Sequence, residues 1–389
     1  MPQFTEEFLS NRAFSDRALA FNAQLPIGGS AGTRLGIPGA PIPQAVKLLP
    51  GGDALIQIYA PQAGTVALQM SDGGALPLTR EDDGFWRGTV PYATAGFKQF
   101  FLLVDGAETL SPLAPVGFGY SRPCNYIEFP EQDCDFYLLK DVPHGFVVRD
   151  IFPSRVTGRY EPCMVYLPPE YMVRTRERYP VLYLQHGHGE NEKCWVYQGK
   201  VHYIMDNLLA EGRALPCLIV MNNGMVHSRT ANGEPCMDAG LLQDLIAEDC
   251  IPFIESRYRV MADREHRAMA GLSMGSMQTS MTVMDRPDLF TWAGIFSGFL
   301  RSLPGTGTDD SHLKALDDPA FPDRYRLFWR AIGRDDGFLP IFRRDSALLR
   351  ERGLDPERWP AHTITYYPGG HEWQVWRKCA RDFLPLLFR

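Results

Sequence analysis

Short apolar runs of β type dominate the chain between Asp53 and Glu128. Turn sequences such as "SDGG" and "EDDG" separate these runs, whose length and spacing are typical of an all-β sandwich. We therefore predict a small immunoglobulin-like sandwich over residues 51–130. Residues 1–50 are a predicted N-terminal extension, in which a Gly- and Pro-rich loop follows a short helical pattern, "SDRALAFNAQ".

Apolar strands and amphipathic helices alternate over residues 140–389. The segments "YPVLYLQHG", "LPCLIVMNNG" and "HRAMAGLSMG" are short and rich in apolar residues, as buried strands are. Helical spacing follows them in "VHYIMDNLLAEGRA", in "GLLQDLIAEDCIPFIESRYRV" and in "SMQTSMTVMDRPDLF". This alternation predicts an α/β domain, whose doubly wound, mostly parallel sheet is covered by helices on both faces.

A G-x-S-x-G motif stands between a predicted strand and a predicted helix, at Gly271, Ser273 and Gly275. This is the setting of a nucleophile elbow, a sharp turn that lifts the serine hydroxyl above the carboxyl edge of the sheet. Glycines two residues to either side remove side chains that would collide there. Ser273 is therefore the predicted nucleophile. The N–H of Met274, at the helix N-terminus, is one predicted donor to an oxyanion.

A nucleophilic serine needs a histidine base, which in this fold class follows the serine and the acid along the chain. Three histidines lie downstream of Ser273. We assign the base to His371, because its loop, "YYPGGHEW", joins a predicted strand to the last predicted helix. His312, in a polar stretch, and His362, at the start of a strand, are interpreted as solvent-exposed or structural residues.

The acid and the second oxyanion donor are expected on loops that follow other strands. After the strand "RLFWRAIG", the G-x-x-D spacing from Gly333 favours Asp336 as the acid over Asp335. The Gly-rich loop in "VLYLQHGHGENEKCW" follows an early strand and is expected beside the elbow. It offers the backbone N–H of His188 as the partner of the Met274 N–H.

The same loops raise two further possibilities. Trp195 and Trp373 are candidates to stack on an aromatic acyl group, with the filling of the core as the alternative. His186 and His188 do not predict a metal site, because no carboxylate or third histidine accompanies them at ligand spacing. We expect neither a metal nor a cofactor.

The charge and hydropathy of the chain limit the classes of partner that we expect. The 389 residues carry a formal net charge of −7 and no long basic run, which argues against nucleic acid. No apolar run reaches 18 residues, so we expect no membrane span. The first residues lack the pattern of a signal peptide, which predicts a cytoplasmic protein, or a secreted one if a signal has been removed. The sequence leaves the oligomeric state open, a homodimer included.

Six segments, in order, resemble the esterase-D-like branch of the α/β-hydrolases, and within it carbohydrate esterase family 1. They are "YLPPEY", "YPVLYLQHGHGENEKCWVYQGK", "IMDNLLAEGRALPCLIVMNNG", "AGLSMGS", "AIGRDDG" and "YPGGHEW". The resemblance covers roughly residues 140–389 and implies Ser273, Asp336 and His371 as the catalytic triad. The β-rich segment, through "DGFW" and "VDG", is similar to early-set domains of the carbohydrate-binding module family 48 type. In such a domain Trp86 is either a sugar platform or, as we favour, a core residue.

The resemblance implies a serine esterase that acts on feruloyl esters of plant cell-wall oligosaccharides. The alternatives within the enzymes are an enterochelin esterase and an acetyl-xylan esterase. Arg301, Arg334 and Arg343 give the predicted site some positive charge, but neighbouring aspartates offset it, which favours the feruloyl substrate over an anionic siderophore. The non-enzymatic alternative is a carbohydrate-binding protein on an inactive hydrolase fold.

Overall fold

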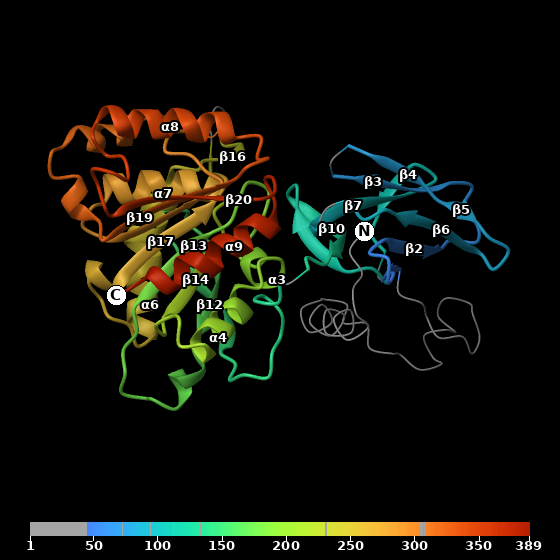
Figure 1. Ribbon diagram of the computed structural model, residues 1–389, viewed down its shortest axis with the longest axis horizontal. Coiled ribbons are helices and arrows are strands. Elements are labelled where there is room, and N and C mark those ends of the chain that lie inside the picture. The colour runs from blue at the N-terminus through green and yellow to red at the C-terminus, as the bar shows by residue number, and fades with distance from the viewer. Residues whose placement is uncertain are drawn as a thin grey trace. The chain divides into compact units, whose positions relative to one another are not determined.

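The computed structural model describes residues 45–389, except residues 72, 94, 112, 133, 230, 231, 304, 305 and 307. It divides the chain into two compact units, Met1–Leu139 and Lys140–Arg389. The predicted N-terminal extension, with its short helix, lies almost entirely outside the described residues. The two units are coloured blue to teal and teal to red in Figure 1.

The first unit is a β-sandwich of two antiparallel sheets, with strand orders β1-β2-β6-β5 and β4-β3-β7-β10-β9; β8 pairs with β7. In β2 every second residue is buried, as expected for a strand with one face on a core. The strands are β1 (Val46–Leu48), β2 (Ala54–Tyr59), β3 (Val66–Met70), β4 (Ala75–Pro77), β5 (Thr79–Arg80), β6 (Phe85–Val90), β7 (Gly96–Val104), β8 (Ala107–Thr109), β9 (Val116–Gly119) and β10 (Arg122–Phe129).

Trp86 belongs to the core of this sandwich. Its side chain packs in the cluster that contains Ile56, Leu68 and Phe100, and its indole N–H donates to the carbonyl of Ala60 at 2.9 Å. The interpretation as a core residue is therefore confirmed, and Trp86 does not offer a platform for a sugar.

An eight-stranded sheet with the order β11-β12-β14-β13-β17-β18-β19-β20 forms the second unit. The strands from β14 to β20 are parallel, whereas β12 pairs antiparallel with both β11 and β14. The predicted α/β class and mostly parallel sheet are thus confirmed. The strands are β11 (Phe146–Pro153), β12 (Tyr160–Leu167), β13 (Val181–Gln185), β14 (Leu218–Asn222), β17 (Arg267–Leu272), β18 (Trp292–Phe296), β19 (Leu327–Gly333) and β20 (His362–Tyr367).

Helices cover both faces of this sheet, with α7 and α8 on one side and α4 and α9 on the other (Figure 1). All residues of β13, β14, β17, β18 and β19 are buried, because apolar side chains meet helices on both faces. The α-helices are α3 (Cys194–Tyr197), α4 (Val201–Ala210), α5 (Leu241–Asp244), α6 (Ile251–Arg257), α7 (Met274–Asp285), α8 (Leu339–Glu351) and α9 (Trp373–Phe383).

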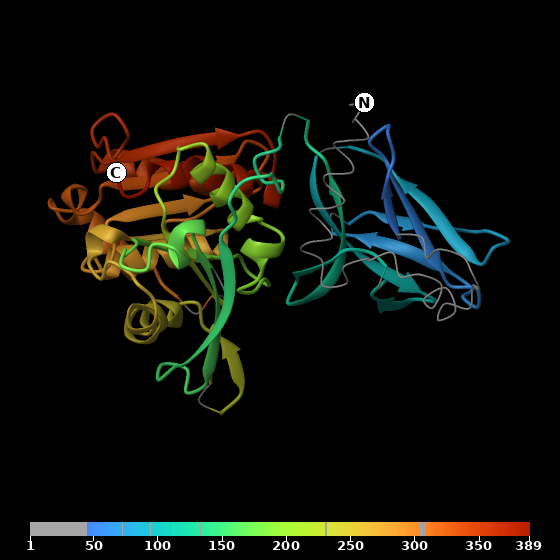
Figure 2. The same cartoon turned by 90° about the horizontal axis from the view of Figure 1, so that it is seen from below.

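Shorter elements complete the second unit. A π-helical segment, Leu245–Cys250, joins α5 to α6, so that the long helix predicted there is continuous but irregular. The small hairpin of β15 (His227–Arg229) and β16 (Pro235–Met237) extends from the sheet in Figure 2. The 3₁₀ helices are Pro169–Met172, Arg264–His266, Ser311–Asp317, Pro322–Arg324 and Leu384–Leu386. No helix in the described part of the chain is long and apolar enough to cross a membrane.

Candidate active site

Ser273 occupies the turn between β17 and α7 with a strained backbone. Its φ of 52° and ψ of −121° lie in a region that residues other than glycine rarely adopt. A Cβ at Gly271 would lie 2.3 Å from the carbonyl oxygen of Gly275, and one at Gly275 would lie 2.4 Å from that of His186. Both motif glycines are therefore required by close backbone contacts: that of Gly271 lies within the elbow, as the sequence argument expected, whereas that of Gly275 is made with the loop after β13.

The three predicted triad residues come together at the carboxyl edge of the sheet. Nε2 of His371 lies 2.9 Å from Oγ of Ser273, and Nδ1 of His371 lies 2.9 Å from Oδ2 of Asp336. Asp336 follows β19 and is buried, whereas Asp335 beside it is exposed. The neutral imidazole can thus donate from Nδ1 to the carboxylate and accept the serine proton at Nε2, which is the arrangement of a general base.

Other contacts fix the orientation of this base. The second carboxylate oxygen of Asp336 accepts the backbone N–H of Phe338 at 2.9 Å. The rings of Phe338 and Trp376 contact the His371 ring edge-on, with centroids 4.9 and 5.1 Å away. These residues were missed by the sequence analysis, because no motif identifies the aromatic neighbours of a catalytic histidine.

The loop after β13 lies directly beside the nucleophile, since a Cβ at Gly187 would be 3.3 Å from Cβ of Ser273. The N–H of Gly187 donates to Glu190 Oε2 at 3.0 Å, and that of Gly189 donates to the sulfur of Met225 at 3.3 Å. His188 stands between these two glycines in the chain, and its backbone N–H has no acceptor among the described residues. That group and the Met274 N–H, first in α7, remain the two candidate oxyanion donors.

The two histidines of this loop have different surroundings. The His188 side chain is exposed. His186 is buried, contacts the Gly187 carbonyl through Nδ1 at 2.8 Å and accepts the Gly224 N–H at Nε2, also at 2.8 Å. Burial lowers the pKa of His186 to about 4, so the ring is neutral and holds the loop. Across the described residues, no three His, Cys, Asp or Glu side chains gather as a metal site would require.

The prediction that Trp195 and Trp373 stack on a substrate is wrong. Their exposed fractions are 1% and 4%, and they contact each other edge to face at 5.2 Å. Both indole N–H groups are satisfied inside the protein, that of Trp195 by the carbonyl of Gln185 and that of Trp373 by Glu190. The rings fill the core beside the loop after β13 (residues 186–193), which carries the candidate N–H of His188 and is called the oxyanion loop below, because their large apolar area is more stable there.

A methionine-rich apolar cluster lies next to the elbow. Its buried members are Ala239, Met274, Met277 and Phe299. Partly buried side chains pack around them: Met225, Met237, Met281, Leu303, Phe338 and Ile341. Two of these residues contact the candidate site itself, since Phe338 touches the ring of His371 and Met225 accepts the N–H of Gly189 in the oxyanion loop. The cluster is therefore an apolar region beside the predicted nucleophile that consists largely of flexible methionine side chains.

The other candidate histidines are structural. His312 is buried, and its Nε2 lies 2.6 Å from the carbonyl oxygen of Leu300. His362 is also buried, and its Nδ1 lies 2.7 Å from the carbonyl oxygen of Leu354. Each ring thus holds a neighbouring backbone carbonyl, and among the described residues neither ring has a hydrogen bond or ring contact with Ser273.

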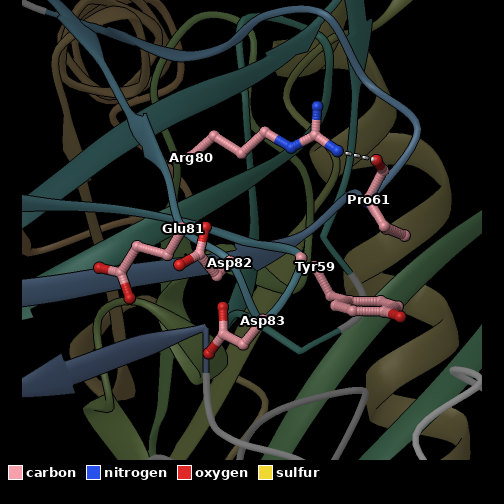
Figure 3. A pocket seen from close by; sticks show the side chains of 7 residues that line it. Tyr59, Pro61, Arg80, Glu81, Asp82 and Asp83 are labelled. Carbon is pink, nitrogen blue, oxygen red and sulfur yellow. Dashed lines mark hydrogen bonds between the residues drawn. The ribbon is translucent and has the colours of Figure 1, made fainter.

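A separate pocket of about 480 Å³ opens on the β-sandwich (Figure 3). It is lined by Tyr59, Pro61, Arg80, Glu81, Asp82, Asp83 and Gly84. Most of its charged groups are engaged locally. Arg80 donates to the carbonyl of Pro61 at 2.7 Å, and Arg87 pairs with Glu81 and Asp83. The pocket does not contain a nucleophile with a base and is no candidate for the reaction.

The elbow, the acid and the histidine follow one another along a parallel sheet in the order that defines a serine hydrolase of the α/β-hydrolase fold. The comparisons with known proteins agree. The model of the family described as putative esterase matches residues 154–380, and the chain belongs to this family.

Three relatives illustrate the similarity. An endo-1,4-beta-xylanase/feruloyl esterase of Xylanibacter ruminicola is 37% identical over 254 residues, which are 64% of this chain but only 35% of that protein. A solved ferulic acid esterase is 26% identical, with a TM-score of 0.54 over 62% of this chain and 97% of the other. The enterobactin esterase of Shigella flexneri is 15% identical, with a TM-score of 0.59 over 86% of this chain and 92% of the other, which shows a shared fold.

Proposed function

We propose that the protein is a serine esterase that hydrolyses hydroxycinnamoyl, in particular feruloyl, esters of plant cell-wall oligosaccharides. The observation that carries the esterase chemistry is the continuous chain of contacts from Ser273 through His371 to Asp336, with 2.9 Å at each step. The feruloyl substrate is supported by the names of the relatives in Xylanibacter ruminicola and among the solved structures.

The reaction follows from the geometry. His371 takes the proton of Ser273 as the serine oxygen attacks the ester carbonyl, and buried Asp336 stabilises the resulting imidazolium. The N–H groups of His188 and Met274 stabilise the oxyanion; one such donor is typically worth about 3 kcal/mol of barrier. As the tetrahedral intermediate collapses and the ester C–O bond breaks, the His371 imidazolium gives its proton to the leaving sugar oxygen, which departs as a hydroxyl group. Water, activated by the same histidine, releases the acid from the acyl-enzyme.

The apolar cluster beside the elbow also supports an aromatic acyl group. The partly buried members of the cluster include Met225, Met237 and Phe338, and such side chains bind a flat, methoxylated ring through dispersion and sulfur–aromatic contacts. An anionic siderophore would instead need free positive charge. Arg301 is paired with buried Asp345 at 2.7 Å, which removes one of the three candidate cations.

The test is the release of ferulate from methyl ferulate and of p-nitrophenol from p-nitrophenyl acetate, with Ser273→Ala as the blank. We expect serine-dependent turnover of both esters, with higher kcat/KM on the ferulate. Turnover of the acetate alone would contradict the feruloyl substrate and direct attention to acetylated sugars. Equal turnover by Ser273→Ala would contradict the mechanism.

A further inference from the structure

The buried carboxyl group of Glu190 joins two elements that carry the reacting groups. Its Oε2 accepts the N–H of Gly187 at 3.0 Å, in the oxyanion loop. Its Oε1 accepts the indole N–H of Trp373 at 2.9 Å. Trp373 is the first residue of α9 and comes two residues after the catalytic His371. Glu190 therefore links the loop on one side of the serine to the helix behind the base on the other.

The same residue helps to fix the direction of the proposed oxyanion donor. The N–H of His188 and the carbonyl of Gly187 belong to one trans peptide, in which they point in opposite directions. The Gly187 carbonyl lies 2.8 Å from Nδ1 of His186 and accepts the backbone N–H of Glu190 at 3.3 Å. These two contacts hold the carbonyl away from the site. Because the N–H of His188 points the opposite way, it is aimed toward the site. Glu190 thus holds the Gly187 carbonyl with its backbone and the Gly187 N–H with its side chain.

Packing alone does not account for a carboxyl group at this position. Glu190 is only 9% exposed, and burial raises its pKa to about 7. Its carboxyl group accepts hydrogen bonds from the Gly187 N–H and the Trp373 indole, and neither donor is charged. The neighbouring acid of the loop, Glu192, is also buried, with 5% of it exposed, but its Oε1 lies 3.9 Å from Nε of Arg149. A buried carboxylate without a cation is costly, and such groups concentrate at functional sites.

We propose that Glu190 is a positioning residue of the esterase. Its carboxylate braces the oxyanion loop against the start of α9, so that the His188 N–H and the His371 imidazole keep their places on either side of Ser273. The proposal rests on the proposed esterase function, although not on the identity of the acyl group.

The test compares Glu190→Gln, Trp373→Phe and their double variant, with Glu192→Gln as the matched control on the same loop. Glutamine keeps the size of the side chain, but its single carbonyl oxygen can accept only one of the two donors. The assay substrate is p-nitrophenyl acetate. Failure to cleave methyl ferulate would therefore count against the feruloyl substrate and leave this comparison intact.

We expect each single variant at the brace to lower kcat about tenfold and to change KM less than threefold. The reason is that the oxyanion contact forms only in the transition state. The kcat of the double variant should lie within about twofold of that of the less active single variant, because both changes remove the same link. Glu192→Gln should keep kcat within about twofold of the wild type.

Three results would overturn the proposal: wild-type kcat in folded Glu190→Gln, an equal loss in Glu192→Gln, or losses that multiply in the double variant. If Glu190→Gln does not fold, Trp373→Phe decides alone, because it keeps an aromatic ring in the core while it removes the indole donor and part of the ring volume. Wild-type kcat in that variant would contradict the brace.

Discussion

Two buried carboxyl groups flank the candidate nucleophile and differ in what they bind. Asp336 accepts from the ring of His371 and from the Phe338 backbone, and the ring becomes a cation during the proposed reaction. Glu190 accepts from a backbone N–H and an indole, which both stay neutral. One carboxyl group faces a partner whose charge changes in the reaction, and the other only holds groups in place.

We infer from this difference that Asp336 takes part in the chemistry, whereas Glu190 positions other groups. Loss of the first carboxylate removes the group that stabilises the imidazolium, whereas loss of the second changes the aim of an N–H that is still present. We therefore expect substitutions on the His371 side of the serine to affect the rate far more than substitutions on the oxyanion side. The following predictions test that ranking, beginning with the serine that both sides share.

Ser273→Gly is expected to lower kcat on p-nitrophenyl acetate by about 10⁵-fold or more, because no nucleophile remains. The same change should raise the free energy of unfolding by about 1 kcal/mol, since glycine adopts a φ of 52° without strain. Urea unfolding of the two proteins measures the second effect. An unchanged or lower stability would show that the elbow does not store strain at Ser273.

Asp336→Asn is expected to lower kcat by about 10⁴-fold, because the amide cannot stabilise the imidazolium and favours the wrong tautomer. Asp335→Asn is the matched control, since this neighbouring carboxyl group is exposed. It should stay within about twofold of the wild type. Steady-state kinetics of the two variants decide between them, and the reverse result would move the acid to Asp335.

Glu190 should make stability depend on pH in a direction opposite to that of an ion-paired acid. Its pKa is raised from 4.5 to about 7 in the folded protein, so the folded state binds the proton more tightly than the unfolded state. Its favourable contribution is complete below about pH 4.5 and is lost as the pH rises toward 7, by up to about 3 kcal/mol.

The measurement is the difference in unfolding free energy between the wild type and Glu190→Gln at pH 5, 6, 7 and 8. We expect the variant to gain relative to the wild type as the pH rises, although its kcat is lower. Groups common to both proteins cancel in this difference. A constant difference across the range would show that the Glu190 carboxyl group does not titrate there.

Gly275→Ala is expected to lower the free energy of unfolding by about 1–3 kcal/mol, because the added methyl group would meet the His186 carbonyl. That carbonyl belongs to the oxyanion loop, so the variant should also lose activity. Gly51→Ala, where the structure leaves open space, is the control and should change stability by less than about 0.5 kcal/mol. Equal thermal shifts in both variants would contradict a specific contact at the elbow.

Much of the fold was predictable, because its signals are local. The alternation of apolar strands with amphipathic helices over residues 140–389 indicated the parallel sheet. The antiparallel strand β11 was missed: its burial pattern is mixed, and its sequence, "FVVRDIFP", has neither the continuous apolar character of a buried strand nor a clear alternation. The hairpin β15–β16 was missed as well, because its strands are only three residues long.

The sequence by itself determined the reacting groups. The elbow demands glycine at 271 for a reason that lies within five residues, because a Cβ there would meet the Gly275 carbonyl. The spacing after two strand ends marked Asp336 and His371. Tertiary structure alone decided the surroundings of these groups. Trp373 is buried and donates its indole N–H to Glu190, a residue 183 positions earlier in the chain. Backbone geometry is set by near neighbours and leaves a trace in the sequence. Burial depends on which distant side chains fill the remaining space, and no local pattern records it.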